Sequence, residues 1–439
     1  MKFKNIAIIA HVDHGKTTFV DQLLKKSGTF RENEEVAVRA MDSNDIERER
    51  GITILAKTTS IHYDGYKINI LDTPGHADFG GEVERIMNMV DGVMLLVDAY
   101  EGTMPQTRFV LKKALEAGVK PIVVINKVDK PTARVDKVLD EVIDLFIELG
   151  ASEEQLDFKV AYVSALNGTA SLDPDINTQS QSYDDIFKLI IDEIPDPKAD
   201  INGDLQFQPA LLDYNEYVGR IGIGKVHSGT IKVNEMVSCV RLDGSIKQFR
   251  IQKLFGFDGL KRVEINEADA GDIVAIAGLM DISVGETICN VGKEKALPIL
   301  RIDEPTLKMT FMVNNSPFVG REGKIVTARK IGERLFKETQ KDVSLKVEES
   351  GNESWTVSGR GELHLSILIE NLRREGFELQ VSKPEVIIKE IDGVKCEPYE
   401  DVQIEVSDEC VGNVIEALGL RGGKMDNMSN VNNLIRLNY

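Results

Sequence analysis

Short apolar runs alternate with amphipathic segments over the first part of the chain. The runs that fit buried strands span residues 6–10, 68–71, 93–97, 122–125 and 160–163. Residues 135–149 carry apolar side chains at helical spacing. This alternation predicts a mainly parallel sheet with helices on both faces. Within 54–71, two alternating runs meet at Asp64-Gly65, a dipeptide typical of a tight hairpin.

The pattern changes after the stiff segment Pro195-Asp196-Pro197. Residues 205–298 contain short β-rich runs separated by turn signals, with almost no helical periodicity, and this favours a small β-barrel. From Glu304 to Pro384 the apolar spacing indicates elements in the order β-α-β-β-α-β, which is the order of a ferredoxin-like α+β domain.

The last part of the chain has a strand-like run at 402–406 and a helix-like run at 411–418. These fit the start of a further α/β domain that is cut off before it encloses a core. The predicted fold is therefore multidomain, α/β and β. Its predicted parts are a P-loop nucleotide domain at 1–198, a β-barrel at 204–300, a ferredoxin-like domain at 304–385 and an incomplete α/β segment at 386–439.

Composition narrows the class of protein. No apolar run approaches the ~18 residues that a membrane span needs, so we expect a soluble chain without a membrane partner. The formal net charge of −19 disfavours binding to nucleic acid by overall attraction. The four cysteines are far apart and lack metal-ligand spacing, which favours reduced, mostly buried thiols in a cytoplasmic protein.

The segment Ala10–Thr18, AHVDHGKTT, follows the first strand and opens a helix, as a P-loop does. Backbone N–H groups there, over Asp13, His14, Gly15 and Thr18, would surround phosphate. Lys16 would reach the β- and γ-phosphates, and Thr17 would bind Mg²⁺. Ala10 stands where the motif usually has its first glycine, so a chance glycine turn before a helix remains a minority alternative.

Two further motifs end predicted strands. Asp72 of the DTPGH segment can meet Mg²⁺ through water, and the N–H of Gly75 can approach a γ-phosphate. By itself this segment fits an ordinary Pro-Gly turn as well. Asn126, Lys127 and Asp129 of NKVD suit guanine, because the Asp129 carboxylate accepts hydrogen bonds from groups that adenine lacks, while Lys127 lies along the ring.

A weaker signal is the tripeptide Ser164-Ala165-Leu166 after the strand at 160–163, whose N–H groups could bind the guanine carbonyl; an ordinary loop is the alternative. Four such signals, each at the carboxyl end of a strand and in this order, are strong together because open α/β sheets bind ligands at that edge. The predicted ligands are GTP or GDP with Mg²⁺.

With these motifs in view, the chain resembles the BipA/TypA family of ribosome-associated translational GTPases. The most specific stretches are MDSNDIERERGITILAKTTSI (41–61), DTPGHADFGGEVERIMNMVDG (72–92), NKVDKPTARVD (126–136), LDFKVAYVSALNG (156–168) and GRGELHLSILIENLRREGFELQVSKPEVIIKEIDG (359–393). The resemblance implies a domain order like that of elongation factor G. It also implies that the family continues beyond the strand at 436–437, so that we expect this chain to lack a C-terminal part.

The resemblance also assigns roles. Thr53 would bind Mg²⁺ and close over the γ-phosphate, and His76 would orient the attacking water beside an apolar gate of Val12 and Ile52. The catalytic set is then His76, Lys16 and Thr53, and the metal ligands are Thr17, Thr53 and Asp72. His11, His14 and His364 are expected to be structural.

The implied function is a monomeric GTP hydrolase that binds the bacterial ribosome, both RNA and protein, in its GTP form and acts in translation or in ribosome assembly under stress. Competition by an alarmone nucleotide at the GTP site is left open. The alternatives within the class are a tetracycline-resistance ribosomal protection protein and a factor like LepA. A GTP-binding assembly scaffold without stimulated turnover is the alternative outside it.

Overall fold

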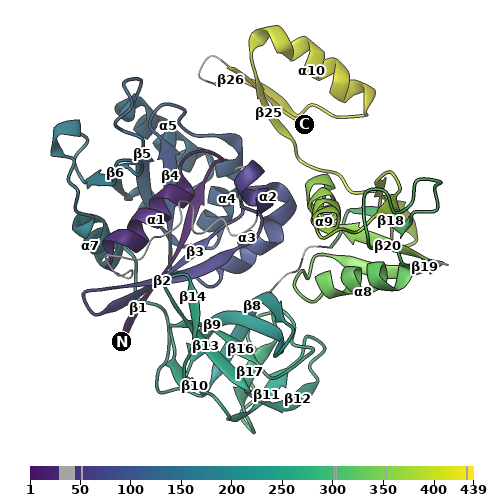
Figure 1. Cartoon of the computed structure of the whole chain (residues 1–439). Helices are drawn as coiled ribbons and strands as arrows, with labels where there is room; N and C mark the ends of the chain where they lie inside the picture. Colours follow the sequence, from purple (N-terminus) through teal and green to yellow (C-terminus); the bar gives the residue numbers. More distant parts are fainter. Residues whose placement is uncertain (29–44, 51–52, 301, 303, 352, 432–433) are drawn as a thin grey trace. The chain divides into compact units, whose positions relative to one another are not determined.

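The computed structural model describes residues 1–28, 45–50, 53–300, 302, 304–351, 353–431 and 434–439 (Figure 1). Residues 1–384 form one compact unit and residues 385–439 a second. Ile52 of the expected apolar gate lies outside the described residues, as does part of the 41–61 stretch.

The first part of the chain folds around a seven-stranded sheet in the order β2-β3-β1-β4-β5-β6-β7. Its strands are β1 (Lys2–Ala10), β2 (Lys57–Tyr63), β3 (Tyr66–Asp72), β4 (Gly92–Asp98), β5 (Lys120–Asn126), β6 (Lys159–Ser164) and β7 (Thr169–Ser171). Its α-helices are α1 (Lys16–Lys26), α2 (Asp45–Arg50), α3 (Gly80–Met87), α4 (Pro105–Glu116), α5 (Val135–Glu148), α6 (Glu153–Leu156) and α7 (Asp184–Glu193). Two 3-10 turns, η1 (Ala77–Phe79) and η2 (Ile176–Thr178), complete this part.

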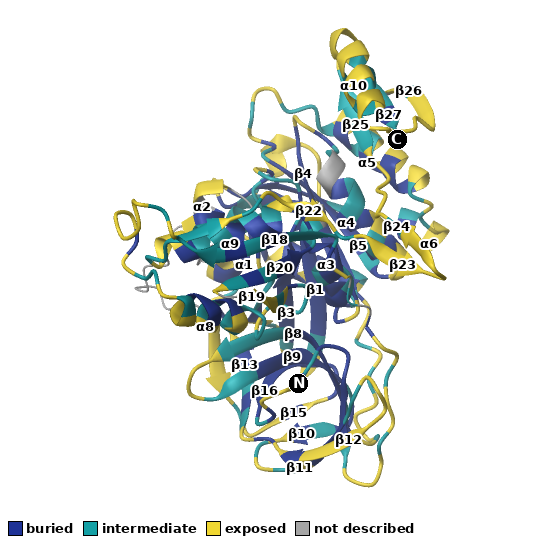
Figure 2. Cartoon of the chain, turned by 90° about the vertical axis from the view of Figure 1, so that its right-hand side faces the viewer, coloured by how far each residue is buried: buried dark blue, intermediate teal, exposed yellow. Residues whose placement is uncertain are grey.

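The central strands of this sheet are parallel, and only the two edge strands run antiparallel to their neighbours. Alternate side chains of β1 enter two different cores. Ile6 and Ile8 pack with α1 and α7 on one face, while Ala7 and Ile9 pack with α3, α4 and α5 on the other. Figure 2 shows β1, β3 and β4 as buried strands. The predicted parallel sheet covered on both faces is confirmed.

The expected hairpin is also present. β2 and β3 pair antiparallel with Tyr63 opposite Tyr66, and both turn residues, Asp64 and Gly65, have positive φ. This is the turn geometry that an Asp-Gly dipeptide favours. The hairpin matters for the site because β3 ends on Asp72.

A β-rich part follows. Its eight-stranded sheet has the order β12-β11-β17-β8-β9-β16-β13-β14, with a separate β10-β15 pair. The strands are β8 (Gln206–Asn215), β9 (Gly219–Ser228), β10 (Thr230–Lys232), β11 (Met236–Val240), β12 (Ile246–Arg250), β13 (Lys253–Asp258), β14 (Lys261–Glu264), β15 (Glu267–Asp269), β16 (Ile273–Ala277) and β17 (Thr287–Asn290). One buried cluster, which includes Phe207, Val226 and Ile276, forms its core.

A buried polar network joins the β-rich part to the first sheet. Asp272 accepts hydrogen bonds from the Lys67 ammonium at 2.8 Å to each carboxylate oxygen, and from Asn69 at 3.1 Å. Asn69 in turn donates to Asn5 at 2.8 Å. Because Lys67 and Asn69 lie on β3, this network fixes the strand that carries Asp72.

The next part has the element order β18 (Leu307–Val313), α8 (Ala328–Glu338), β19 (Lys346–Gly351), β20 (Ser354–Gly359), α9 (Glu362–Arg374) and β21 (Leu379–Val381). The sheet order β19-β20-β18-β21, with antiparallel pairs, is that of a ferredoxin-like unit. Phe311, Trp355 and Leu365 lie in its core. The predicted β-α-β-β-α-β order is confirmed.

The second unit contains β22 (Glu385–Val386), β23 (Lys389–Ile391), β24 (Val394–Cys396), β25 (Gln403–Val406), α10 (Asp408–Leu420), β26 (Asn427–Val431) and β27 (Leu434–Asn438). The strand β25 and the helix were predicted, whereas β26 and the β23-β24 hairpin were not. No described residue of α10 is buried.

The prediction of mostly buried cysteines is only half right. Cys239 and Cys289 are buried, Cys396 is half-buried and Cys410 is exposed. No helix in the described part of the chain has the length and apolar character needed to cross a bilayer.

Candidate nucleotide site

A cavity of about 330 Å³ opens at the carboxyl ends of β1, β3, β5 and β6. The lining residues are Ala10, His11, Val12, Asp13, Gly15, Lys16, Thr17, Thr18, Thr53, Gly75, His76, Asn126, Lys127, Asp129, Lys130, Ser164, Ala165 and Leu166. All four predicted motifs therefore meet at one place. Of the predicted site residues, only His14 and Asp72 do not line the cavity.

The P-loop takes its shape from two residues with left-handed backbone. Asp13 has φ of 62° and Gly15 has φ of 92°. A Cβ at Gly15 would lie 2.5 Å from Nδ2 of Asn126, so only glycine fits between the loop and β5. Gly15 is also the N-cap of α1, and the positive end of that helix faces the cavity.

His14 is fully buried beneath the loop. Its Nδ1 lies 3.4 Å from the carbonyl oxygen of Leu96, and its Nε2 lies 3.2 Å from Glu101. Burial, together with nearby His11, lowers the pKa of His14. The enclosed ring supports the loop, and the backbone N–H of His14 donates to the carbonyl oxygen of His11 at 3.2 Å.

Asn126 connects the P-loop to the loop after β6. Its Nδ2 donates to the carbonyl oxygen of His14 at 2.7 Å, and its Oδ1 accepts from the N–H of Ala165 at 3.0 Å. The Asn126 residue is buried. The Ala165 N–H is thus engaged within the protein, a use that the sequence did not reveal.

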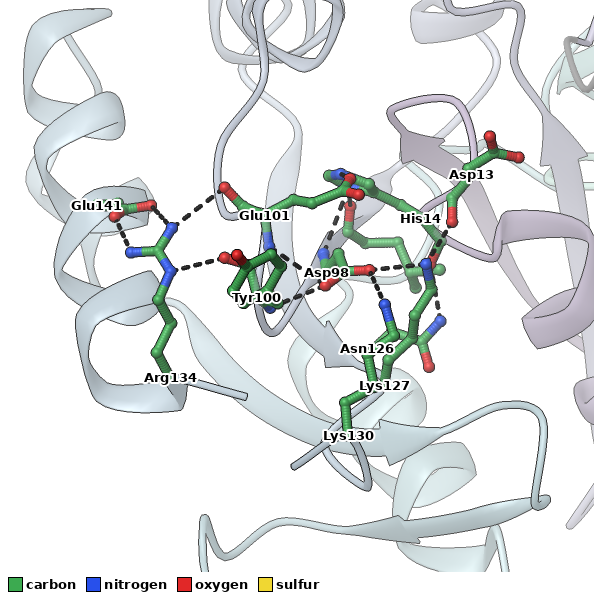
Figure 3. A network of polar contacts seen from close by, with 11 residues as sticks. Asp13, His14, Asp98, Tyr100, Glu101, Asn126, Lys127, Lys130, Arg134 and Glu141 are labelled. Atoms are coloured by element: carbon green, nitrogen blue, oxygen red, sulfur yellow. Dashed lines mark hydrogen bonds and ion pairs between the residues drawn. The ribbon is translucent and has the colours of Figure 1, made fainter. Parts of the chain in front are cut away.

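Asp98, at the end of β4, anchors Lys127, the lysine predicted to lie along the base. Its carboxylate lies 2.6 Å from the Lys127 ammonium and 3.2 Å from that of Lys130, and it accepts from the Tyr100 N–H at 2.8 Å (Figure 3). Burial alone would raise the pKa of Asp98, but the hydrogen bonds from Lys127 and the backbone lower it to about 2. Lys127 also donates to the Asp13 carbonyl oxygen at 2.6 Å.

Asp98 and Lys130 are missing from the sequence-based prediction. An acidic residue that ends a buried strand between two motif-bearing strands was the available signal, since neighbouring carboxyl ends of a parallel sheet share an edge. Which lysine pairs with the Asp98 carboxylate depends on packing and cannot be predicted from the spacing of residues along the sequence.

Of the groups expected around Mg²⁺, Thr53 lies beside Asp72, and so does Lys16. The Thr53 hydroxyl lies 3.4 Å from Asp72 Oδ2, and the Lys16 ammonium lies 2.7 Å from Oδ1 without the alignment of a hydrogen bond. Asp72 Oδ1 is thus a buried carboxylate oxygen that is paired with the Lys16 ammonium but accepts no hydrogen bond, and such hard oxygen donors fit Mg²⁺. The described residues contain no cluster of three His, Cys, Asp or Glu that would compete as a metal site.

His76 borders the same cavity, with its side chain 37% exposed. Its Nδ1 lies 3.3 Å from Asp78 Oδ1 and 3.2 Å from the Asp78 backbone nitrogen. The ring is therefore held by Asp78 at Nδ1 and meets the Phe79 ring edge-on, with centroids 6.4 Å apart.

Comparisons with known proteins agree with this site. Residues 1–196 match the Elongation factor Tu GTP binding domain, and residues 219–289 match Elongation factor Tu domain 2. The Large ribosomal subunit assembly factor BipA of Bacillus subtilis (strain 168) is 66% identical over 436 residues, which are 99% of this chain and 71% of that protein. The chain belongs to the BipA family of translational GTPases.

Other BipA proteins are similar over the same length. That of Escherichia coli (strain K12) is 54% identical over 100% of this chain and 72% of its own. The BipA of a Synechocystis strain is also 54% identical, over 100% of this chain and 74% of its own. A solved structure from Thermus thermophilus covers 100% of this chain with a TM-score of 0.69 at 16% identity, and so agrees in fold alone.

Three predictions are therefore confirmed. The chain is a BipA-family protein, its fold is that of a translational GTPase with a G domain followed by a β-rich domain, and it is a GTP hydrolase that binds GTP and GDP.

Proposed function

We propose that this BipA-family GTPase acts in assembly of the large ribosomal subunit. In this proposal it binds ribosomal RNA and proteins in its GTP form, is stimulated by them to hydrolyse GTP, and leaves in its GDP form. The observation that carries the proposal is the 66% identity to a protein named as a large ribosomal subunit assembly factor, spread over 99% of the chain.

The proposed nucleotide contacts follow the lining of the cavity. Backbone N–H groups of Asp13–Thr18 would bind the phosphates, and Lys16 would leave Asp72 to reach the β- and γ-phosphates. Gly75 would approach the γ-phosphate. At the other end, Asp129 would accept from guanine, Lys127 would lie along the base, and the loop Ser164-Ala165-Leu166 would bound its edge.

We include Mg²⁺ in the proposal, held by Thr17, Thr53 and Asp72. The metal would neutralise charge on the β- and γ-phosphates. Movement of Lys16 onto the phosphates would leave the buried Asp72 carboxylate to the cation, which fits the position of Oδ1. Thr53 would join the metal from the segment that precedes β2.

Hydrolysis needs a water in line with the γ-phosphate more than it needs covalent chemistry. We assign the orienting of that water to His76, which borders the cavity near Gly75. Lys16 and the backbone N–H groups would stabilise the charge that develops on the phosphate oxygens.

The proposal extends to the organisation of the chain. We assign nucleotide chemistry to residues 1–198, and contacts with the ribosome to residues 204–300, 304–385 and 386–439. We also propose that the protein is a monomer in the cytoplasm, and competition by an alarmone nucleotide at the GTP site is left open.

Co-sedimentation with ribosomes and large-subunit precursors tests this function. The chain should pellet with a non-hydrolysable GTP analogue and remain in solution with GDP, and single-turnover GTP hydrolysis should accelerate when the particles are added. Equal binding with the GTP analogue and with GDP would refute the switch. A hydrolysis rate that is the same with and without these particles would favour an assembly scaffold. Release of ribosome-bound tetracycline would favour a protection protein.

A further inference from the structure

Helix α9 begins without a cap from its own segment. Its N-cap is Gly361, which has no side chain to accept a hydrogen bond from the first turn. A helix N-terminus leaves several N–H groups without helical partners, and a carboxylate is a favoured acceptor there. The first turn of α9 finds such an acceptor 286 residues away along the chain.

The acceptor is Asp78, which lies in η1, two residues after His76. Asp78 Oδ2 accepts from the backbone N–H of His364 at 3.1 Å. His364 is the third residue of α9, the position whose N–H an N-cap side chain normally binds. Asp78 therefore serves as the missing cap, and its negative charge lies at the positive end of the helix.

The other carboxylate oxygen faces the ring of His76. Asp78 Oδ1 lies 3.3 Å from His76 Nδ1. When Nδ1 carries the proton it donates to this oxygen, and Nε2 is left as an acceptor for a water proton. When Nδ1 is unprotonated it accepts instead from the Asp78 N–H at 3.2 Å. A carboxylate at Oδ1 favours the first arrangement.

Asp78 is ionised in this setting. Burial by itself would raise the pKa of its carboxyl, but the hydrogen bonds from His76 and from the His364 N–H outweigh burial and lower the pKa below its ordinary value. One carboxylate thus bridges the ring of the proposed catalytic histidine and the first turn of α9.

The bridge requires glycine at position 361 because the Asp78 carboxylate lies too close for a side chain, and not because of the backbone angles there. A Cβ on Gly361 would lie 2.4 Å from the carboxyl carbon and both oxygens of Asp78. Its φ of −163° and ψ of −179° describe extended backbone that any residue adopts. Alanine at this position would therefore displace the Asp78 carboxylate and leave the fold of α9 unstrained.

Apolar packing holds the two sides together. Phe79, next to Asp78, packs with Ile46 of α2, Ile54 and Ile367 of α9. The ring of Phe79 also meets the ring of His364, with centroids 5.8 Å apart. Such packing leaves Asp78 little freedom while α9 is in place.

We propose that Asp78 is a positioning residue that orients His76 for GTP hydrolysis only while α9 binds its carboxylate. The ferredoxin-like part of the chain then controls the chemistry of the nucleotide domain through one hydrogen bond and one glycine. This inference rests on the proposed role of His76.

The test compares single-turnover GTP hydrolysis, with and without ribosomes, and the affinity for a non-hydrolysable GTP analogue. Gly361→Ala should slow hydrolysis by on the order of tenfold, since misplaced groups lose their orientation. Affinity for the analogue should stay within about twofold, because the ground state does not use His76. Asp78→Asn should behave alike, and the double variant should be no slower than either single variant.

The matched control is Glu362→Ala, which changes an exposed residue of the same helix turn. It should hydrolyse GTP at the rate of the unchanged chain. A purely structural role for Gly361 and Asp78 would lower the unfolding midpoint and leave the rate per nucleotide-bound molecule intact, and that outcome overturns the inference.

His76→Ala separates the positioning role of Asp78 from the proposed role of His76 in hydrolysis. Slow hydrolysis in His76→Ala with normal rates in Gly361→Ala and Asp78→Asn would remove the positioning role and keep the proposed catalytic histidine. Normal hydrolysis in His76→Ala would instead remove the proposed role of His76 itself.

Discussion

The connection that Asn126 makes between two loops of the site predicts a large effect on nucleotide binding. Asn126→Ala removes the amide that joins the His14 carbonyl oxygen at 2.7 Å and the Ala165 N–H at 3.0 Å. Both residues that lose their partner are almost fully buried, with exposed fractions of 0% for His14 and 1% for Ala165.

The magnitude follows from the two groups left without partners. A buried donor or acceptor without a hydrogen bond costs about 1–3 kcal/mol, so the pair costs at least about 2 kcal/mol. If the bound nucleotide holds the P-loop and the loop after β6 in their ordered positions, the bound state keeps both unpaired groups, and this cost weakens the binding free energy. At about 1.4 kcal/mol for each factor of ten, the dissociation constant for GDP should rise at least about 30-fold.

Titration with a fluorescent GDP analogue at fixed Mg²⁺ measures this change. The control is Asn167→Ala, because Asn167 is exposed in the same loop and only its backbone N–H bonds to Ser164. Asn126→Asp should bind no better than the alanine variant, since its second oxygen would face the His14 carbonyl. A dissociation constant for Asn126→Ala within about threefold of the unchanged chain would refute this role.

Three further predictions concern specificity and stability. Asp129→Asn should weaken GTP binding and gain XTP binding, because the new amide donates to the second carbonyl of xanthine; competition titration decides it, and an unchanged preference for GTP contradicts the guanine assignment. Burial raises the pKa of Glu82 from 4.5 to about 7. Between these two pH values the folded chain holds a proton on Glu82 that the unfolded chain has lost, so the free energy of unfolding should fall, by up to about 3 kcal/mol, as the pH rises from one to the other. Glu82→Gln should flatten this dependence in urea unfolding between about pH 5 and about pH 8, and an unchanged slope excludes Glu82 as its source. Asp272→Ala leaves the buried Lys67 ammonium unpaired and should lower the free energy of unfolding by about 3–5 kcal/mol in the same assay. The double variant Lys67→Met with Asp272→Leu removes both charges and should recover most of that stability. Equal destabilisation of the single and the double variant would contradict a paired charge.

Local patterns along the chain were sufficient for much of the fold. The Asp64-Gly65 turn was predictable because few dipeptides favour positive φ at both positions. The nucleotide edge was predictable because strands that read as buried end directly on Asp72 and Asn126, and parallel strands bring such ends together. The unpredicted strand β26 has the sequence NMSNV, which is too polar to stand out as a strand.

Local patterns along the chain therefore specify which chemical groups are present and at which edge of the sheet they gather, since periodicity, turn residues and motif order are local properties. The packing of the folded chain selects which group meets which. It paired Asp98 with Lys127, engaged the Ala165 N–H with Asn126, and placed the Asp78 carboxylate on α9. Those choices depend on packing between segments far apart in the chain, where a few tenths of an ångström separate a hydrogen bond from a clash and no spacing rule applies.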